Sequence, residues 1–326
     1  MSAVPLLEVD RLRVEFPTRR GTLVALDGVS FSVAPGEVLG VVGESGAGKS
    51  ITGLAIVGLL EPPGRIAAGE VRLQGRRIDR LPPEEMRRLR GRRIGMIFQD
   101  PLTSLNPLYT IGRQLEETIL AHLDVGAAEA RARALSLLAE VGIPAAESRF
   151  DHYPHQFSGG MRQRVVIALA LAAEPALVIA DEPTTALDVS LQAQIIALLK
   201  RLARARGTAI MLITHDLGVI AETADRLAVM YAGRIAELGP VRAVLRAPHH
   251  PYTAGLMASI PKSAVGGVRQ RLAQIEGAMP RLNAIPSGCA FHPRCPHRFA
   301  RCTAERPDLL AAGAGSAACW LLAAEA

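Results

Sequence analysis

Eight consecutive residues near the start of the chain have the types and spacing needed to hold a triphosphate. They fit the pattern G-x-x-x-x-G-K-[ST], in which glycines let backbone N–H groups turn toward phosphate oxygens. In this pattern Lys49 contacts the β- and γ-phosphates, and Ser50 binds Mg²⁺. The candidate nucleotide-binding residues of this loop are Gly43, Glu44, Ser45, Gly46, Ala47, Gly48, Lys49 and Ser50.

A pair of acids ends a second apolar segment. Asp181 and Glu182 follow the residues LVIA, so one carboxylate can reach the magnesium shell while the next polarises the attacking water. Acid pairs at strand ends also cap helices or lie in solvated turns. Functional roles are favoured here because an apolar strand bearing Asp is the expected second half of a P-loop site.

Two further polar residues follow apolar segments. His215 closes the segment AIMLITHD, where an imidazole can sense the γ-phosphate, although a surface histidine is the other interpretation. Gln99 ends the segment IGMIFQ, and its side chain either ligates Mg²⁺ or faces water. For both residues, a role at the nucleotide site and a plain surface position are the two interpretations.

The elements that must position these residues are strands alternating with helices. The strand VLGVV leads into the glycine loop, and a helical pattern follows from Lys49. Apolar strands separated by helices predict an α/β fold with a parallel sheet covered on both faces. Short strands are expected within residues 6–42, and hairpins at 71–78 and 226–239.

The organisation predicted for the chain is one large domain with an appendage. We predict a nucleotide-binding domain over 1–260, containing an inserted, amphipathic helical subdomain at about 100–165. Residues 261–326 form a C-terminal extension that is rich in Pro, Gly and Ala at its start.

Composition excludes several classes of protein. With 326 residues that are 49% hydrophobic, the chain is not expected to be disordered. Its start has no signal-peptide pattern, and no segment provides the ~20 apolar residues of a membrane span, so we expect a cytosolic protein with peripheral membrane contact only. The net charge of +6 is weak evidence for nucleic acid, because the arginines are scattered and aromatic residues are only 4%. We expect no nucleic-acid partner.

A third motif, Ser158-Gly159-Gly160, precedes an apolar helical segment, and with it the chain resembles the ATPase subunits of ABC transporters. The resemblance covers residues 6–260 and implies an ABC-type P-loop ATPase core with an antiparallel β subdomain. Met161 departs from the family pattern S-G-G-Q, in a form similar to that of oligopeptide and dipeptide importers. The motifs that carry the resemblance are 43–50, Gln99, Ser158–Gly160, Asp181-Glu182, Ala186-Leu187-Asp188 and His215.

The resemblance also implies roles for individual residues. Glu182 would be the catalytic base and His215 the γ-phosphate switch, while Asp181 and Gln99 would join Ser50 around Mg²⁺. Residues implied to contact nucleotide or the opposite subunit are Phe16 on the adenine, Asp188, and the partner-facing Ser158, Gly159 and Gly160.

The implied function is ATP hydrolysis that powers import of oligopeptides, dipeptides or similar small solutes. A single nucleotide domain implies a second ABC ATPase subunit, two transmembrane permease subunits, an extracytoplasmic solute-binding protein, and a peripheral position on the cytoplasmic face of the inner membrane. A soluble ABC ATPase of translation or DNA repair is the alternative, but two linked nucleotide domains or a long coiled-coil insertion are not seen in this sequence. A dinucleotide-binding oxidoreductase lacks support because G-x-G-x-x-G is missing.

All four cysteines lie in the last forty positions with the spacing C-x5-C-x6-C-x16-C. Similar tails occur in peptide-importer ATPases that carry a 4Fe-4S cluster, and four thiolates suffice to hold one. Zinc is an alternative, although its usual C-x2-4-C pairs are missing, and unligated thiols are another. The candidate ligands are Cys289, Cys295, Cys302 and Cys319.

Overall fold

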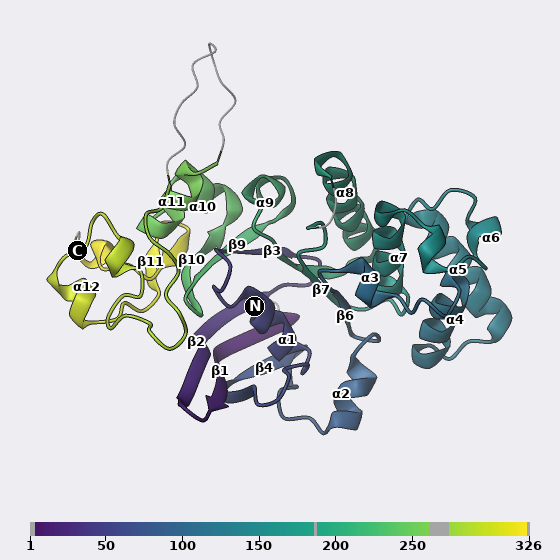
Figure 1. The fold of residues 1–326 in the computed structure, drawn as a ribbon, viewed down its shortest axis with the longest axis horizontal. Helices are drawn as coiled ribbons and strands as arrows, with labels where there is room; N and C mark the ends of the chain where they lie inside the picture. The colour runs from purple at the N-terminus through teal and green to yellow at the C-terminus, as the bar shows by residue number, and fades with distance from the viewer. Residues whose placement is uncertain (1–3, 186–187, 261–273, 325–326) are drawn as a thin grey trace, which may run out of the picture.

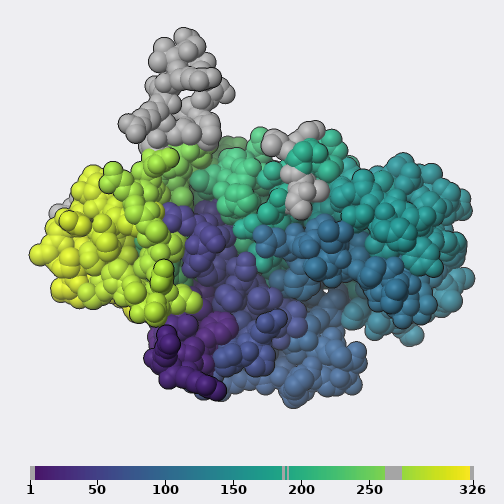
Figure 2. Space-filling view, in the orientation of Figure 1, coloured from purple at the N-terminus to yellow at the C-terminus, as the bar shows by residue number. Residues whose placement is uncertain are grey.

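The structure is a computed structural model that describes residues 4–185, 188–260 and 274–324. A central sheet runs through the molecule, with a second, antiparallel sheet beneath it (Figure 1). Helices α4–α7 gather at one end and the C-terminal residues at the other, as the teal and yellow surfaces of Figure 2 show. The molecule is therefore elongated, with the N-terminal strands between its two ends.

The central sheet has the strand order β11-β12-β10-β9-β3-β8-β7-β6 among the described residues. Strands β9, β3, β8, β7 and β6 are parallel, and β10, β12 and β11 continue the sheet in antiparallel pairing. Their bounds are β3 Val38–Val42, β6 Ile94–Ile97, β7 Leu177–Asp181, β8 Ala209–Ile213, β9 Arg226–Tyr231, β10 Arg234–Pro240, β11 Leu310–Ala312 and β12 Gly315–Ala317.

The antiparallel sheet has the order β2-β1-β4-β5, and its strands come from the N-terminal part of the chain. Its first two strands pair from Leu7 opposite Val33 to Thr18 opposite Gly21. A tight turn then leads into β3: the Glu37 N–H donates to the carbonyl of Ala34 (3.2 Å), with Gly36 at φ 70°. The bounds are β1 Leu7–Thr18, β2 Gly21–Val33, β4 Arg65–Leu73 and β5 Arg76–Arg77.

Helices cover the sheet and form the insertion between β6 and β7. The insertion begins at α3 and ends with α7, which passes on to β7. The bounds are α1 Lys49–Ile56, α2 Pro83–Leu89, α3 Pro101–Ser104, α4 Ile111–His122, α5 Ala127–Glu140, α6 Ala146–Arg149, α7 Gly159–Leu171, α8 Val189–Arg206, α9 Leu217–Thr223, α10 Val241–Arg246, α11 Pro251–Ala258, α12 Ala300–Ala304 and α13 Leu321–Ala324, with the 3₁₀ turns η1 Pro154–Gln156 and η3 His292–Arg294.

Two hydrophobic cores lie on opposite faces of the central sheet. Along β7, Val178 and Ala180 enter the core beneath the helices, whereas Leu177 and Ile179 enter the core shared with the antiparallel sheet. This alternation follows from the two-residue period of a strand. All five residues of β3, β7 and β8 are buried, which explains their unbroken apolar sequences.

The predicted α/β fold with a parallel sheet is confirmed, and so is the hairpin at 226–239, which forms β9 and β10. The predicted domain boundaries stay predictions, but the described residues after 273 add β11 and β12 to the central sheet rather than folding apart from it. No helix in the described parts of the chain is long and apolar enough to cross a bilayer.

Candidate nucleotide-binding site

The glycine loop connects β3 to α1 and needs glycine at its tightest points. Gly43 has φ 154°, and a Cβ atom there would lie 2.3 Å from the carbonyl oxygen of Met230. Gly48, the residue before α1, has φ 102°, and a Cβ atom would lie 2.7 Å from the Leu26 side chain. Both positions exclude a side chain, because the first packs against backbone and the second needs a left-handed conformation.

Lys49 lies inside this loop with only 6% of its surface exposed. Its ammonium group donates to the carbonyl oxygens of Gly43 (2.9 Å) and Glu44 (3.2 Å). Burial lowers the pKa of Lys49, while the nearby carboxylates of Glu182 and Asp181 oppose that shift. A buried cation at this place supplies charge for an anionic ligand.

Ser50 and Asp181 meet at the first turn of α1. The Ser50 hydroxyl donates to Oδ1 of Asp181 at 3.0 Å. Burial raises the pKa of Asp181, although this hydrogen bond and Lys49 oppose the shift. A hydroxyl and a carboxylate held together form an oxygen-rich donor set of the kind that Mg²⁺ prefers, so these residues fit the ion that the sequence predicted.

Glu182 is the centre of a polar cluster at the carboxyl ends of neighbouring strands. Its Oε2 atom accepts from Nε2 of Gln99 (3.3 Å) and from the hydroxyl of Thr185 (2.8 Å), and it lies 3.4 Å from Nδ1 of His215. Gln99 follows β6, Glu182 follows β7 and His215 follows β8, and these strands are neighbours in the sheet. The parallel order therefore gathers the predicted residues at one edge.

Two other predicted residues, Ser158 and Asp188, lie at the starts of helices. Ser158 precedes α7 and caps it by accepting from the Met161 N–H (3.4 Å), and Asp188 caps α8 by accepting from the Leu191 N–H (2.9 Å). Neither makes a hydrogen bond to the glycine loop among the described residues, and Ala186 and Leu187 of the same motif lie outside them.

Phe16 lies in β1 of the antiparallel sheet, where its ring packs close to Gly64. A Cβ atom at Gly64 would come within 2.6 Å of Cε1 of this ring. The predicted stacking of Phe16 on adenine stays a prediction.

Glu44 has two distant partners that its sequence context does not predict. Its backbone N–H donates to the Tyr252 hydroxyl (2.9 Å), and its carboxylate accepts from both terminal nitrogens of Arg294 (2.9 and 3.0 Å). No local pattern signals contacts between residues so far apart in the chain. Thr185 was also missed, although its place three residues after Glu182 was visible.

The four cysteines come together within the C-terminal extension. All four line one small cavity of about 10 Å³, and none is in a disulfide. Burial raises the pKa of Cys289 and Cys295, and that of Cys319 to about 11. In the parts of the chain that the structure describes, no group of His, Cys, Asp or Glu is arranged to hold a metal ion, so the 4Fe-4S cluster and zinc both stay predictions without support here.

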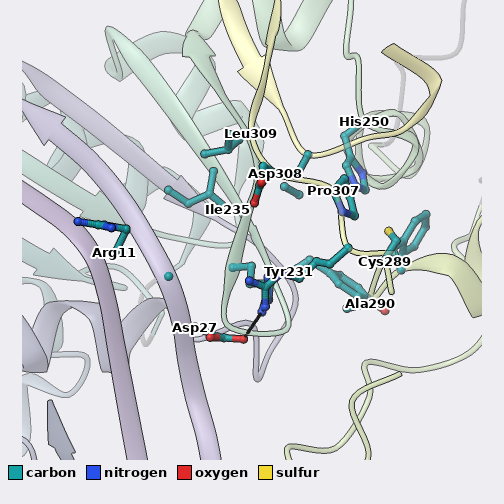
Figure 3. A pocket seen from close by; sticks show the side chains of 16 residues that line it. Arg11, Asp27, Tyr231, Ile235, His250, Cys289, Ala290, Pro307, Asp308 and Leu309 are labelled. Carbon is teal, nitrogen blue, oxygen red and sulfur yellow. Dashed lines mark hydrogen bonds and ion pairs between the residues drawn. The ribbon is translucent and has the colours of Figure 1, made fainter. Parts of the chain in front are cut away.

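A larger cavity of about 260 Å³ lies where the extension meets the core (Figure 3). Tyr231, His250 and Cys289 line one side of it, and Asp27 of β2 lies at another side. Asp27 is paired with Arg234 and Arg306. This cavity is separate from the glycine loop, none of whose residues line it.

Comparisons with known proteins place the chain in a family. The family model described as "ABC transporter" matches residues 26–185, and the model "Oligopeptide/dipeptide transporter, C-terminal region" matches residues 236–302. The dipeptide transport ATP-binding protein DppD of Escherichia coli is 49% identical over 304 residues, covering 93% of this chain and 92% of that protein. The chain belongs to the family of ABC transporter ATP-binding proteins.

Other members and solved structures agree with this assignment. DppD of Bacillus subtilis is 48% identical over 318 residues, covering 97% of this chain and 94% of its own length. The dimeric, post-hydrolysis ATP-binding cassette MJ0796 bound to ADP and Pi has a TM-score of 0.65 and 29% identity, covering 72% of this chain and 99% of the cassette. CbiO1 of Clostridium perfringens has a TM-score of 0.63 and 27% identity, covering 76% of this chain and 97% of that protein.

The ABC family assignment confirms three predictions: the family resemblance, the ABC ATPase core and ATP hydrolysis as the enzymatic activity. The alternative of a soluble ABC ATPase in translation or DNA repair is not favoured, because relatives that are 48% and 49% identical to this chain are dipeptide transport proteins by name.

Proposed function

We propose that this ABC ATPase powers import of dipeptides, oligopeptides or similar small solutes, as the names of its relatives suggest. The observation that carries the catalytic part of the proposal is the cluster of Gln99, Glu182 and His215 beside the Ser50–Asp181 pair. These side chains come from four segments of the chain and meet where the γ-phosphate of a nucleotide held by the loop would lie.

The loop binds the phosphates through its amides and Lys49. The positive end of α1 adds to this field, because unpaired N–H groups at a helix start attract anions. Lys49, whose ammonium group now contacts loop carbonyls, exchanges those contacts for phosphate oxygens.

Ser50 and Asp181 would hold Mg²⁺, with Gln99 as a further oxygen ligand. The ion would neutralise charge that develops on the phosphate oxygens. Asp181 suits this role because it is 8% exposed, so its carboxylate lacks the water that would otherwise stabilise its charge.

Glu182 acts on the attacking water. Its carboxylate is held by the Thr185 hydroxyl and the Gln99 amide, which fix its orientation. His215, whose side chain is 61% exposed, lies next to it and can contact the γ-phosphate from the end of β8. As water transfers a proton to Glu182, its oxygen forms a bond to the γ-phosphorus, and the bond from that phosphorus to the β,γ-bridging oxygen breaks, which releases ADP and phosphate.

The site needs a second subunit. Ser158, Gly159 and Gly160 start α7 away from the loop of the same chain, which suits a role at the nucleotide of a partner ATPase. We infer that two such ATPases, two permease subunits and an extracytoplasmic solute-binding protein form the importer, with this chain on the cytoplasmic face of the inner membrane. Closure of the ATPase pair would drive the permeases.

Replacing Glu182 with Gln tests the catalytic assignment. In the assembled transporter, Glu182→Gln should lower ATP turnover by about 10²–10⁴-fold and leave ATP binding intact, because the amide keeps the shape of the carboxylate but cannot accept the proton. Turnover by phosphate release and binding by calorimetry measure the two effects separately. Glu222→Gln, at an exposed glutamate of α9, is the matched control and should change neither. Undiminished hydrolysis by Glu182→Gln would remove Glu182 from this role.

We also infer that the four cysteines bind a 4Fe-4S cluster. What supports this is the ligand number and the single cavity that all four thiols line. Their described arrangement does not itself fit a metal, so the side chains would have to turn and lose their protons on binding. Protein purified without oxygen should contain iron and acid-labile sulfide in equal amounts. Stoichiometric zinc without iron, or neither metal, would contradict the cluster.

A further inference from the structure

The C-terminal extension touches the glycine loop at Glu44. Arg294 lies at the end of the 3₁₀ turn η3, and its side chain is 7% exposed. Its two terminal nitrogens donate separately to the two carboxylate oxygens of Glu44, at 2.9 and 3.0 Å. This fork-to-fork geometry is the strong form of an Arg–carboxylate pair, because two parallel hydrogen bonds fix direction as well as charge.

Arg294 is itself held on several sides. Its Nε atom donates to the carbonyl of Glu276 (2.9 Å), and its guanidinium lies 5.8 Å from the ring centre of Tyr231 and 5.9 Å from that of Phe291. The side chain therefore approaches the loop in one defined orientation, and little rotamer freedom is left to lose when nucleotide binds.

Tyr252 holds the backbone of the same loop residue. This tyrosine, at the start of α11, is fully buried, and its hydroxyl accepts from the Glu44 N–H at 2.9 Å. Its ring packs edge-on against Tyr231 (4.7 Å between ring centres) and lies tilted against Phe291 (5.4 Å). Glu44 is thus fixed through its N–H by Tyr252 and through its carboxylate by Arg294.

The segments of the chain that carry Tyr252 and Arg294 are joined to the central sheet by backbone and side-chain hydrogen bonds. Strand β12 pairs with β10, and the Ala318 N–H donates to the carbonyl of Ala236 at 2.8 Å. Glu237 of β10, which is 2% exposed, accepts from the N–H groups of His249 (2.8 Å) and His250 (3.1 Å) just before α11. Movement of the extension would therefore be transmitted to the loop through short, directed contacts.

We propose that Arg294 is a positioning residue of the nucleotide site, through which the C-terminal extension sets the conformation and the charge of the glycine loop; the proposal rests on the proposed function. Two effects act together. The ion pair holds the loop with its amides ready for phosphate, so less ordering is needed on binding. It also neutralises the Glu44 carboxylate, which would otherwise repel a triphosphate bound to the same loop.

The test compares MgATP binding by calorimetry across a set of full-length variants. Arg294→Met should raise the Kd about tenfold, as expected when a charge-assisted pair loses one partner. Arg294→Lys should fall between it and the wild type, because an ammonium group restores the charge but not the fork. Arg281→Met, at an exposed arginine of the same extension, is the matched control and should bind like the wild type.

A double variant separates the charge effect from general damage. Adding Glu44→Gln to Arg294→Met should recover part of the lost affinity, because the unpaired carboxylate that repels the triphosphate is then gone, while the part that comes from loop positioning stays lost. In the assembled transporter, the KM for ATP should rise in Arg294→Met while kcat changes less than twofold, since Glu182 and Asp181 are untouched. A merely structural role would instead lower kcat and be insensitive to Glu44.

Three outcomes would overturn the proposal: Arg294→Met binding within twofold of the wild type, an equal loss in Arg281→Met, or no recovery in the double variant. Melting curves identify any variant that fails to fold. If Arg294→Met fails to fold, the Kd for MgATP of Arg294→Lys and of Glu44→Gln is compared with that of the wild type instead. If the wild-type protein itself does not bind MgATP, the proposed function fails, and this result is distinct from failure of the Arg294 proposal.

Discussion

At the scale of one residue, Asp181 shows that a carboxylate buried for cation binding lowers the stability of the folded protein. Burial raises the pKa of its carboxyl group above the ordinary value, with Ser50 and Lys49 only partly opposing the shift. An acid whose pKa is raised by folding is a cost to the folded state whenever it is ionised. The cost is present above the folded pKa and disappears as the pH falls toward the unfolded pKa of about 3.9.

We therefore expect Asp181→Asn to stabilise the protein in the absence of magnesium while weakening magnesium-dependent nucleotide binding. At pH 7 the free energy of unfolding should rise by about 1 kcal/mol, because a neutral amide replaces a desolvated charge. Chemical denaturation at a series of pH values measures this gain, which should shrink as the pH approaches about 4.

Asp188→Asn is the matched control for this measurement. Asp188 is exposed and caps α8, and asparagine caps a helix about as well as aspartate does, so little change is expected at any pH. A stabilisation of Asp181→Asn that persisted unchanged at low pH would show that ionisation of this carboxyl group is not its cause.

At the scale of elements, the pairing of β12 with β10 makes the extension part of the central sheet. Gly315 begins β12, and a Cβ atom there would lie 2.4 Å from the backbone oxygen of Leu238 and 2.9 Å from the Cα of Gly239. The two strands can approach this closely only because position 315 carries no side chain.

Gly315→Val should separate β12 from β10 and loosen the extension. We expect faster cleavage of the extension in limited proteolysis, and a rise in the Kd for MgATP of the same order as in Arg294→Met, about tenfold, because Arg294 would lose its fixed position. Ser316→Ala changes the next residue of the same strand without adding bulk, and should leave both measurements unchanged. If cleavage of the extension became faster while the Kd for MgATP stayed unchanged, the extension would not set the conformation of the glycine loop.

At the scale of the whole molecule, the segments that we propose to contact nucleotide lie at two separate places. The loop and its carboxylates lie at the carboxyl ends of strands in the central sheet, whereas Ser158 begins α7 at the end of the helical insertion (Figure 1). The structure of MJ0796, a cassette of the same fold, is dimeric. If the proposed function holds, hydrolysis depends on how two ATPase subunits approach each other.

The sequence alone determined the features whose cause is local. The loop from Gly43 to Ser50 was recognisable because phosphate binding requires glycines and lysine at fixed spacing, and the sheet because its buried strands are continuously apolar. Gln99, Glu182 and His215 were predicted as separate strand ends, and parallel pairing brought them together.

Only the tertiary structure decided which distant residues meet. The Arg294–Glu44 pair joins positions 250 residues apart, and no periodicity or local motif encodes such a contact. Likewise, β11 and β12 are three-residue strands with little pattern of their own, and they are ordered because β10 offers an edge to pair with. A binding motif depends on residues close together in the sequence, so it can be predicted from a short segment. A long-range contact depends on how the packed core orients every element between its two residues.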